Sequence, residues 1–293
     1  MSESNLENIK LYQNSINQNL SIIKDILNDL NLKNKDLSDQ YSKTLALSSS
    51  KIANKWLSGR KYCRTLFAQQ AFKNRYPKKH TLFSLQIDAL VNILDDLLDE
   101  QLSPEEKTFY ILEFLRVFSL HEKDCPEQIK KDLGIYINQL ITLAVAEEFY
   151  QQRVQKETDF DKIVDISTSL LICRGMDMDI FTQIALISQR NISPENKRTI
   201  VHFGRLFRAI NILKKDVDDI SHDQKNKIKT MTTIVLKKKI NFSDYLQQVS
   251  LSIIKKMESV LEPIHSSHYL YSIINNFYQM AKDDQNKIID NLN

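Results

Sequence analysis

Glycine and proline are scarce in this chain, and their scarcity limits the folds that it can adopt. Only four Gly and five Pro occur among its 293 residues. Because these residues make most tight turns, a chain with so few of them is poorly suited to β-sandwiches and barrels. Neither a G-x-G-x-x-G nor a Walker A sequence is present, so a Rossmann architecture is not indicated either.

Apolar residues recur at the spacing of amphipathic helices along most of the sequence. Serine followed by proline and an acid, at 103–106 and 193–195, is typical of a helix start. No strand pattern, fixed repeat or polar linker is evident. The sequence therefore predicts one all-α domain over residues 1–293, a bundle of roughly ten helices. We expect them within 1–40 and over about 61–74, 82–100, 104–121, 126–152, 159–190, 194–221, 242–260 and 265–291.

Charge and cysteine content argue against several kinds of partner and site. The net charge of +3 is nearly balanced and indicates no nucleic-acid partner. Cys63, Cys125 and Cys173 show no C-x-x-C spacing, so neither a disulfide framework nor a zinc site is expected. The first residues lack the features of a secretory signal, and no apolar run is long enough for a transmembrane segment. We therefore expect a cytoplasmic protein.

An acidic cluster ends the predicted helix over 82–100. Asp95, Asp96 and Asp99 form a D-D-x-x-D sequence directly after an apolar run. On a helix Asp95 and Asp99 lie one turn apart on the same face. Two carboxylates so placed can bind Mg²⁺ together with a substrate phosphate, although the same residues also suit an ordinary solvated helix end.

A second acidic stripe ends the predicted helix over 194–221. Asp216, Asp219 and Asp223 follow an apolar face at spacings i, i+3 and i+7, which is one side of a helix. Two such helices facing each other would enclose a cavity that is acidic at its mouth and apolar below. That cavity would suit a diphosphate with a hydrocarbon tail; two ordinary helix ends are the alternative. Its candidate lining residues, which also suit an ordinary core, are Phe67, Phe83, Leu90, Val91, Phe149, Phe207 and Ile210.

Together these motifs resemble those of the class I isoprenoid synthases, which comprise the trans-prenyltransferases and their terpene synthase relatives. The D-D-x-x-D sequence matches the first aspartate-rich motif of that family, and the second acidic stripe approximates the second motif. Upstream, Lys61 and Arg64 match the basic residues of a G-K-x-x-R loop. The resemblance covers about residues 59–235, in the family's order. It implies an isoprenoid synthase-like fold around a central apolar cavity, and a homodimer.

The resemblance also implies a Mg²⁺-dependent reaction on an allylic isoprenyl diphosphate, with isopentenyl diphosphate as a possible second substrate. Two or three Mg²⁺ ions would bind, with the substrate diphosphate, to Asp95, Asp99, Asp216, Asp219 and Asp223. The implied diphosphate contacts are Lys61, Arg64, Arg174, Lys215, Lys225, Lys227 and Lys229. Leu90, Val91 and Phe207 would contact the hydrocarbon tail.

The chain departs from the family pattern at several positions. Lys215 stands where the family has a metal-binding aspartate, and Asp88 stands where it has His or Gln. The arginine pair expected after the first motif is absent. Gly175 is expected to break the helix over 159–190, as in terpene synthases, where an arginine at such a break contacts diphosphate. Arg174 is therefore a candidate diphosphate contact, with a surface salt bridge as the alternative.

These departures weaken the isopentenyl diphosphate pocket and favour a terpene synthase-like diphosphate lyase or cyclase. In that enzyme Asp95, Asp96, Asp99 and Arg174 would be catalytic, since metals and cations stabilise the leaving diphosphate. The apolar cavity would keep the carbocation from water. The retained basic loop leaves a chain-elongating trans-isoprenyl diphosphate synthase as one alternative. Lys215 leaves another, a non-catalytic helical subunit or isoprenoid-binding protein with the same fold.

Overall fold

The computed structural model describes residues 63–99, 125–189, 192–261 and 268–290, and the isolated positions Asn14, Lys107, Tyr110 and Ile111. Within these ranges the chain is α-helix, 3-10 helix and turn, with no strand. The prediction of an all-α protein is therefore confirmed. The helices predicted within 1–40 and over 104–121 lie almost wholly outside the described residues.

Two compact units divide the chain, and we describe each by itself. Unit 1 comprises Met1–Phe67 and Pro77–Glu127, and unit 2 comprises Ala68–Tyr76 and Gln128–Asn293. The helix α3 (Cys63–Phe72) begins in unit 1 and passes into unit 2. The prediction of a single domain over the whole chain stays a prediction.

Unit 1 is described mainly through its long helix α4 (Thr81–Asp99), which the short 3-10 helix η4 (Lys78–His80) precedes. No Gly or Pro interrupts α4. The helix is buried from Phe83 to Ile93 and becomes exposed at Asp95. Its first aspartate motif therefore starts where the buried part of the helix ends.

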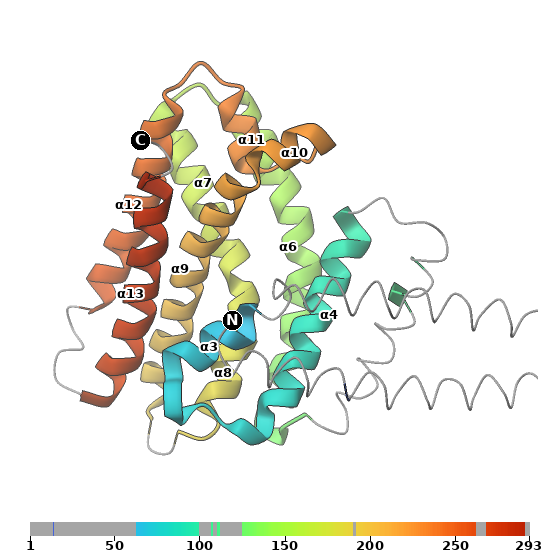
Figure 1. Cartoon of the computed structure of the whole chain (residues 1–293), viewed down its shortest axis with the longest axis vertical. Coiled ribbons are helices and arrows are strands. Elements are labelled where there is room, and N and C mark those ends of the chain that lie inside the picture. The colour runs from blue at the N-terminus through green and yellow to red at the C-terminus, as the bar shows by residue number, and fades with distance from the viewer. Residues whose placement is uncertain are drawn as a thin grey trace, which may run out of the picture. The chain divides into compact units, whose positions relative to one another are not determined.

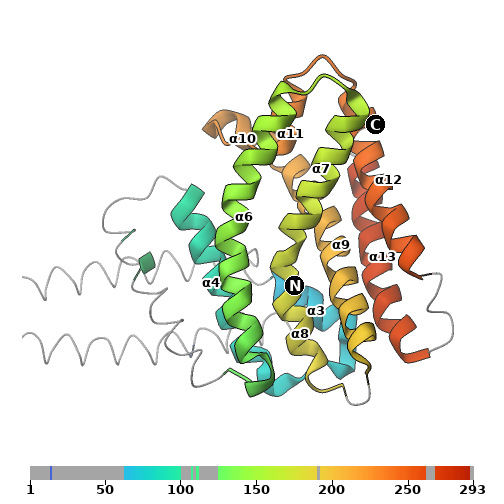
Figure 2. The ribbon, with the colours of Figure 1, turned by 180° about the vertical axis from the view of Figure 1, so that it is seen from behind.

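Unit 2 is a helical bundle in which α9 (Pro194–Asp218) packs against most of the other helices (Figure 1). Its short 3-10 helices are η3 (Lys73–Arg75), η5 (Glu127–Ile129, which begins in unit 1) and η6 (Gly175–Met178). Its other α-helices are α6 (Lys130–Lys156), α7 (Phe160–Arg174), α8 (Asp179–Leu186), α10 (Ile220–Asn226), α11 (Met231–Leu236), α12 (Phe242–Leu261) and α13 (His268–Asp290). Figure 2 shows the same helices from behind.

The helix α9 begins at the residue where the Ser-Pro-Glu sequence predicts a helix start. Ser193 caps the helix by accepting a hydrogen bond from the Asn196 backbone N–H over 3.2 Å, and Pro194 is its first residue. Its apolar face is fully buried, and Phe207 packs on Phe277 of α13 with ring centroids 5.7 Å apart. Each such side chain contributes about 1.5–3 kcal/mol by leaving water. This burial holds α9, and with it the second acidic stripe, in a fixed place within unit 2.

Candidate functional site

A break in the helical path of unit 2 positions the central residue of the site. The helix α7 ends at Arg174, and the chain passes through η6 into α8. The break falls at Gly175, where the sequence predicts it. A Cβ on Gly175 would overlap the carbonyl oxygen of Arg205 in α9, so only glycine permits this close approach of η6 to α9. The break therefore fixes Arg174 beside α9.

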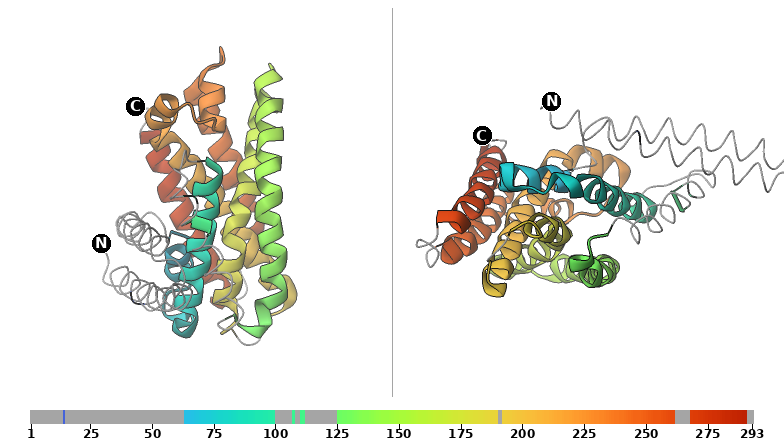
Figure 3. Two further views of the ribbon diagram at one scale, coloured as in Figure 1. Left: turned by 90° about the vertical axis from the view of Figure 1, so that its right-hand side faces the viewer. Right: turned by 90° about the horizontal axis from the view of Figure 1, so that it is seen from below.

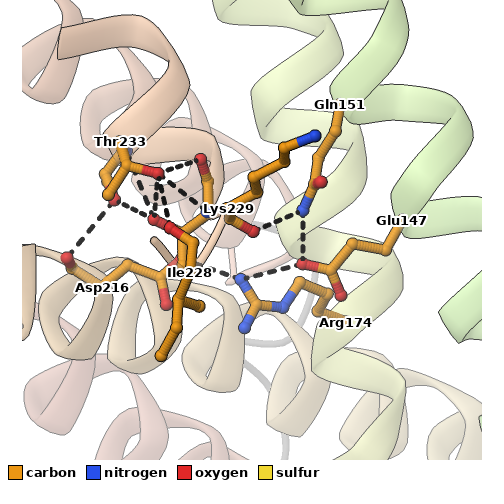
Figure 4. Close-up of polar contacts among 9 residues, drawn as sticks. Glu147, Gln151, Arg174, Asp216, Ile228, Lys229 and Thr233 are labelled. Carbon is orange, nitrogen blue, oxygen red and sulfur yellow. Dashed lines mark hydrogen bonds and ion pairs between the residues drawn. The ribbon is translucent and has the colours of Figure 1, made fainter. Parts of the chain in front are cut away.

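Arg174 bridges two acidic side chains from different helices (Figure 4). Its Nη1 donates to Asp216 Oδ2 over 2.8 Å and lies 3.7 Å from Glu147 Oε1. The side chain of Asp216 is 5% exposed and that of Arg174 is 20% exposed. The structure thus brings together two predicted site residues, Arg174 and Asp216. It adds Glu147 of α6, which the sequence did not single out.

Hydrogen bonds attach the loop between α10 and α11 to this ion pair. Gln151 Nε2 donates to Glu147 Oε1 over 3.3 Å and to the Lys229 carbonyl oxygen over 2.9 Å (Figure 4). The Thr232 hydroxyl donates to the Asp216 carbonyl oxygen over 3.3 Å. Segments from α6, α7, α9 and the α10–α11 loop therefore meet around Arg174.

The remaining aspartates of the second stripe lie just beyond the end of α9. Asp219 is half-buried between α9 and α10, and Asp223 is buried in α10. Burial raises the pKa of Asp223; the hydrogen bond from His222 opposes that rise, and the charges of Asp216 and Asp219 add to it. The three carboxylates thus make one region of negative potential.

These aspartates do not form a complete metal cage by themselves. In the part of the chain that the structure describes, no three His, Cys, Asp or Glu side chains are placed to hold a metal ion. Mg²⁺ is usually bound by one or two carboxylates together with substrate phosphates and water. The carboxylates of the second stripe fit a magnesium ion only in that shared arrangement.

Several lysines predicted to contact diphosphate lie in the same part of unit 2. Lys215 is exposed in the last turn of α9, and Lys225, Lys227 and Lys229 are exposed around the end of α10. Lys227 ends α10 with a left-handed backbone, at a φ of 57°. Their ammonium groups are accessible to an anion from solvent.

The first aspartate motif is only partly described. Asp95 is exposed at the end of α4. The side chains of Asp96 and Asp99, and the whole of Lys61, lie outside the described residues. The metal-binding and catalytic roles of these residues stay predictions.

Arg64 is held inside unit 1 by an ion pair. Its Nη1 donates to Asp88 Oδ1 over 3.0 Å and to Asn92 Oδ1 over 3.1 Å. The Arg64 side chain is only 7% exposed, and that of Asp88 is fully buried. Burial raises the pKa of Asp88, while the charge of Arg64 and the hydrogen bond from the Thr65 backbone N–H oppose the rise. Asp88, a departure from the family pattern, is thus the internal partner of Arg64.

The apolar residues predicted to line a cavity fall into two groups. Phe83, Leu90, Val91, Phe207 and Ile210 are buried, and Phe67 is half-buried. Phe149 is 57% exposed. Such exposure does not fit the predicted place of Phe149 in the wall of a cavity that excludes water.

Two further ion pairs join the helix break to α9. Arg208 Nη2 donates to Asp177 Oδ2 over 3.0 Å, and Arg205 donates to Asp179. Burial raises the pKa of Asp179 to about 6, against the opposing effect of Arg205. The sequence reasoning missed these arginines. The sequence feature that could have revealed them is the presence of two arginines inside the apolar run 203–213. A charge buried there without a partner would be costly, so each arginine predicts an acidic partner.

Comparisons with protein families, with curated proteins and with solved structures found no match to this chain.

Proposed function

We propose that the chain is a Mg²⁺-dependent enzyme of isoprenoid synthase-like fold that ionises an allylic isoprenyl diphosphate, as a terpene synthase-like lyase or cyclase. One observation carries the proposal. The helical path breaks at Gly175, and Arg174 at that break bonds to Asp216 of the second acidic stripe. A cation at a helix break beside a carboxylate stripe is the arrangement that the motifs predict.

Arg174 supplies the charge that the reaction needs on the protein side. Its guanidinium can exchange a carboxylate for a diphosphate group, because each offers a pair of anionic oxygens that can accept two of its N–H bonds. Asp216 and Glu147 hold the guanidinium in place before the substrate arrives. As the carbon–oxygen bond breaks, Arg174 stabilises the negative charge that accumulates on the diphosphate. The exposed lysines around α10 add positive charge for the same group.

Mg²⁺, when bound with the diphosphate, neutralises charge on the leaving group. The predicted ligands are Asp95 and Asp99 in unit 1, and Asp219 and Asp223 in unit 2. Asp216 is less suited to this role, because Arg174 occupies its Oδ2.

The position of Arg64 supports a lyase or cyclase over a chain-elongating synthase. Elongation needs a second cationic pocket, for isopentenyl diphosphate. Arg64 is buried and paired with Asp88, so its charge is already neutralised within unit 1. An anion binding there would have to separate a buried ion pair, at a cost of about 3–5 kcal/mol.

A non-catalytic isoprenoid-binding protein is the second candidate, and Lys215 is the observation that favours it, because an exposed ammonium group stands in the last turn of α9 where the resemblance implies a metal-binding aspartate. The Arg174–Asp216 ion pair is compatible with both candidates. The bond of 2.8 Å between buried Asp216 and Arg174 also serves as a structural contact between α7 and α9. In that case the acidic stripe would have no reaction to support.

Product analysis separates these candidates. The purified chain would be incubated with Mg²⁺ and geranyl, farnesyl or geranylgeranyl diphosphate, with and without isopentenyl diphosphate. Hydrocarbon or alcohol products without isopentenyl diphosphate are expected. Lengthened diphosphates would indicate the elongating synthase, and saturable binding without turnover would indicate the binding protein. If the protein neither bound nor turned over any of these substrates, both candidates would be contradicted.

The matched variants for this experiment are Arg174→Gln and Arg198→Gln. Arg198 is an exposed arginine in the first turns of α9. We expect Arg174→Gln to lower turnover by about a hundredfold or more, and Arg198→Gln to leave it unchanged. Equal turnover in the two variants would remove Arg174 from the mechanism.

A further inference from the structure

The outer side of α6 exposes an unusual number of large apolar residues. Ile141, Val145 and Phe149 follow one another at four-residue spacing, which places them on one side of the helix. They are 58%, 72% and 57% exposed, and Ile135 at the edge of this surface is 48% exposed. We call these four residues the α6 stripe. Figure 3 shows α6 at the margin of the bundle of unit 2.

Exposed cations stand at both ends of the α6 stripe. Lys130 and Lys131 begin the helix, and Arg153 and Lys156 lie in its last turns. Glu148 is the one exposed acid that the structure describes within α6. Among the residues of α6 itself, the exposed surface is therefore apolar in its middle and positive at its two ends.

Arg153 and Phe149 combine these two properties in one contact. The guanidinium carbon of Arg153 lies 5.9 Å from the centroid of the Phe149 ring. An arginine so placed covers apolar surface with its stem and keeps its charge in contact with water. This is the arrangement of residues at the boundary between hydrocarbon and polar headgroups.

The neighbouring basic segment extends the positive charge. Six lysines and no acid occur between Lys225 and Lys239. The segment is attached to α6 by the bond from Gln151 to the Lys229 carbonyl oxygen and by the bond from Lys238 Nζ to the Gln155 carbonyl oxygen, of 2.9 and 3.1 Å. Its charge therefore belongs to the same part of unit 2 as the α6 stripe.

We propose that this side of α6 docks on an anionic lipid membrane, with the α6 stripe inserted among the lipid headgroups and the cations bound to lipid phosphates. Apolar side chains supply the insertion, and each cation near the surface adds to the attraction. This is peripheral binding. Among the described residues no helix is both long and apolar enough to cross a membrane.

The charge distribution favours a membrane over a second copy of the chain. If two α6 helices met in antiparallel order, Lys130 and Lys131 of one copy would face Arg153 and Lys156 of the other. In parallel order each cation would face its own counterpart. Like charges repel in both arrangements, whereas an anionic surface attracts every one of these groups.

Vesicle sedimentation of the full chain tests this proposal. Phosphatidylcholine vesicles with phosphatidylserine should bind the protein, and vesicles of phosphatidylcholine alone should bind it much more weakly. Binding should weaken as salt is added, because salt screens the attraction. Equal binding to the two kinds of vesicle, or no binding to either, would overturn the proposal.

Three variants assign the binding to this surface. Phe149→Glu should lower binding to anionic vesicles by roughly tenfold or more, since it places an acid in the headgroup layer. Lys131→Gln with Lys156→Gln should lower it by roughly fivefold for each charge removed. Tyr271→Glu is the control, because Tyr271 is a 38% exposed aromatic residue on α13. It should bind vesicles like the unchanged protein.

Gel filtration of the same proteins distinguishes a second copy from a membrane. If Phe149→Glu turned a dimer into a monomer and left vesicle binding unchanged, the α6 stripe would be an interface between two chains. Unchanged vesicle binding by Phe149→Glu would overturn the proposal in any oligomeric state.

Discussion

At the scale of single residues, buried charges occur with partners in the described chain. Arg64 pairs with Asp88 in unit 1, and in unit 2 Arg208 pairs with Asp177. Burying both charges of such a pair contributes little net stability, but removing one partner leaves the other uncompensated in a region of low dielectric. Single substitutions at these positions are therefore informative.

Arg64→Met should lower the free energy of unfolding by about 3–5 kcal/mol, because it leaves the fully buried Asp88 without its cation. Urea unfolding measures the change. The double variant Arg64→Met with Asp88→Asn should recover more than half of the loss, since the uncompensated charge is then absent. A loss below about 1 kcal/mol in the single variant would show that the ion pair is not as buried as the structure has it.

Asp179 makes the stability of unit 2 depend on pH. Its folded pKa of about 6 lies above the ordinary value of 3.8. Between these values the folded chain keeps a proton that the unfolded chain has lost, so this group favours folding at low pH and less so as the pH rises. The unfolding free energy of the protein minus that of Asp179→Asn should therefore fall by about 2–3 kcal/mol from pH 4 to pH 7.

Asp165→Asn is the control for removing a carboxylate, because Asp165 is exposed on α7. It should change the unfolding free energy little. A difference for Asp179→Asn that is flat, or that rises with pH, would contradict a raised pKa at Asp179.

At the scale of elements, the helix break at Gly175 determines the site. We expect Gly175→Ala to destabilise the protein by about 1–3 kcal/mol, because the added methyl group overlaps the Arg205 carbonyl oxygen and forces η6 away from α9. Gly134→Ala, in α6, is the matched control, since a methyl group added there would meet no neighbouring segment within 4 Å. It should stabilise the protein by about 0.5–1 kcal/mol. Equal effects of the two changes in thermal unfolding would contradict the close approach at Gly175.

The sequence predicted most described helices because their apolar periodicity is strong. The expected helix over 194–221 corresponds to α9 (Pro194–Asp218), and that over 242–260 to α12 (Phe242–Leu261). The expected segment over 159–190 contains the break at Gly175, which the glycine itself signalled. The short helices α10 and α11 were not predicted, because six or seven residues hold too few turns for a periodic pattern.

The sequence alone could not predict which side chains of different helices contact each other. Arg174 was predicted either to contact diphosphate or to form a surface salt bridge, and the structure gives it Asp216 and Glu147 as partners. Nothing in the local sequence of α6 specifies that Glu147 meets α7, because that contact depends on how the helices pack. The exposure of Phe149 was missed for the same reason.

At the scale of the whole molecule, the two acidic motifs belong to different units, and each follows a buried apolar helix. Asp95 follows the buried part of α4 in unit 1, and Asp216 ends the buried face of α9 in unit 2. The contribution of each motif to the proposed reaction can be tested separately, by replacing one of its aspartates in the intact chain. The proposed reaction assigns Mg²⁺ binding to both motifs, so replacing a metal-binding aspartate in either should lower the rate by roughly a hundredfold.

Release of inorganic pyrophosphate from geranyl, farnesyl or geranylgeranyl diphosphate, measured with and without Mg²⁺, is the decisive test of the proposed ionisation. We predict release only with Mg²⁺, and a loss of roughly a hundredfold in Asp95→Asn. Asp165→Asn, an acid-to-amide change at an exposed position on α7, should release pyrophosphate at the full rate. No release from any of the three substrates, or equal release by the Asp95→Asn variant and the unchanged protein, would contradict the proposed reaction.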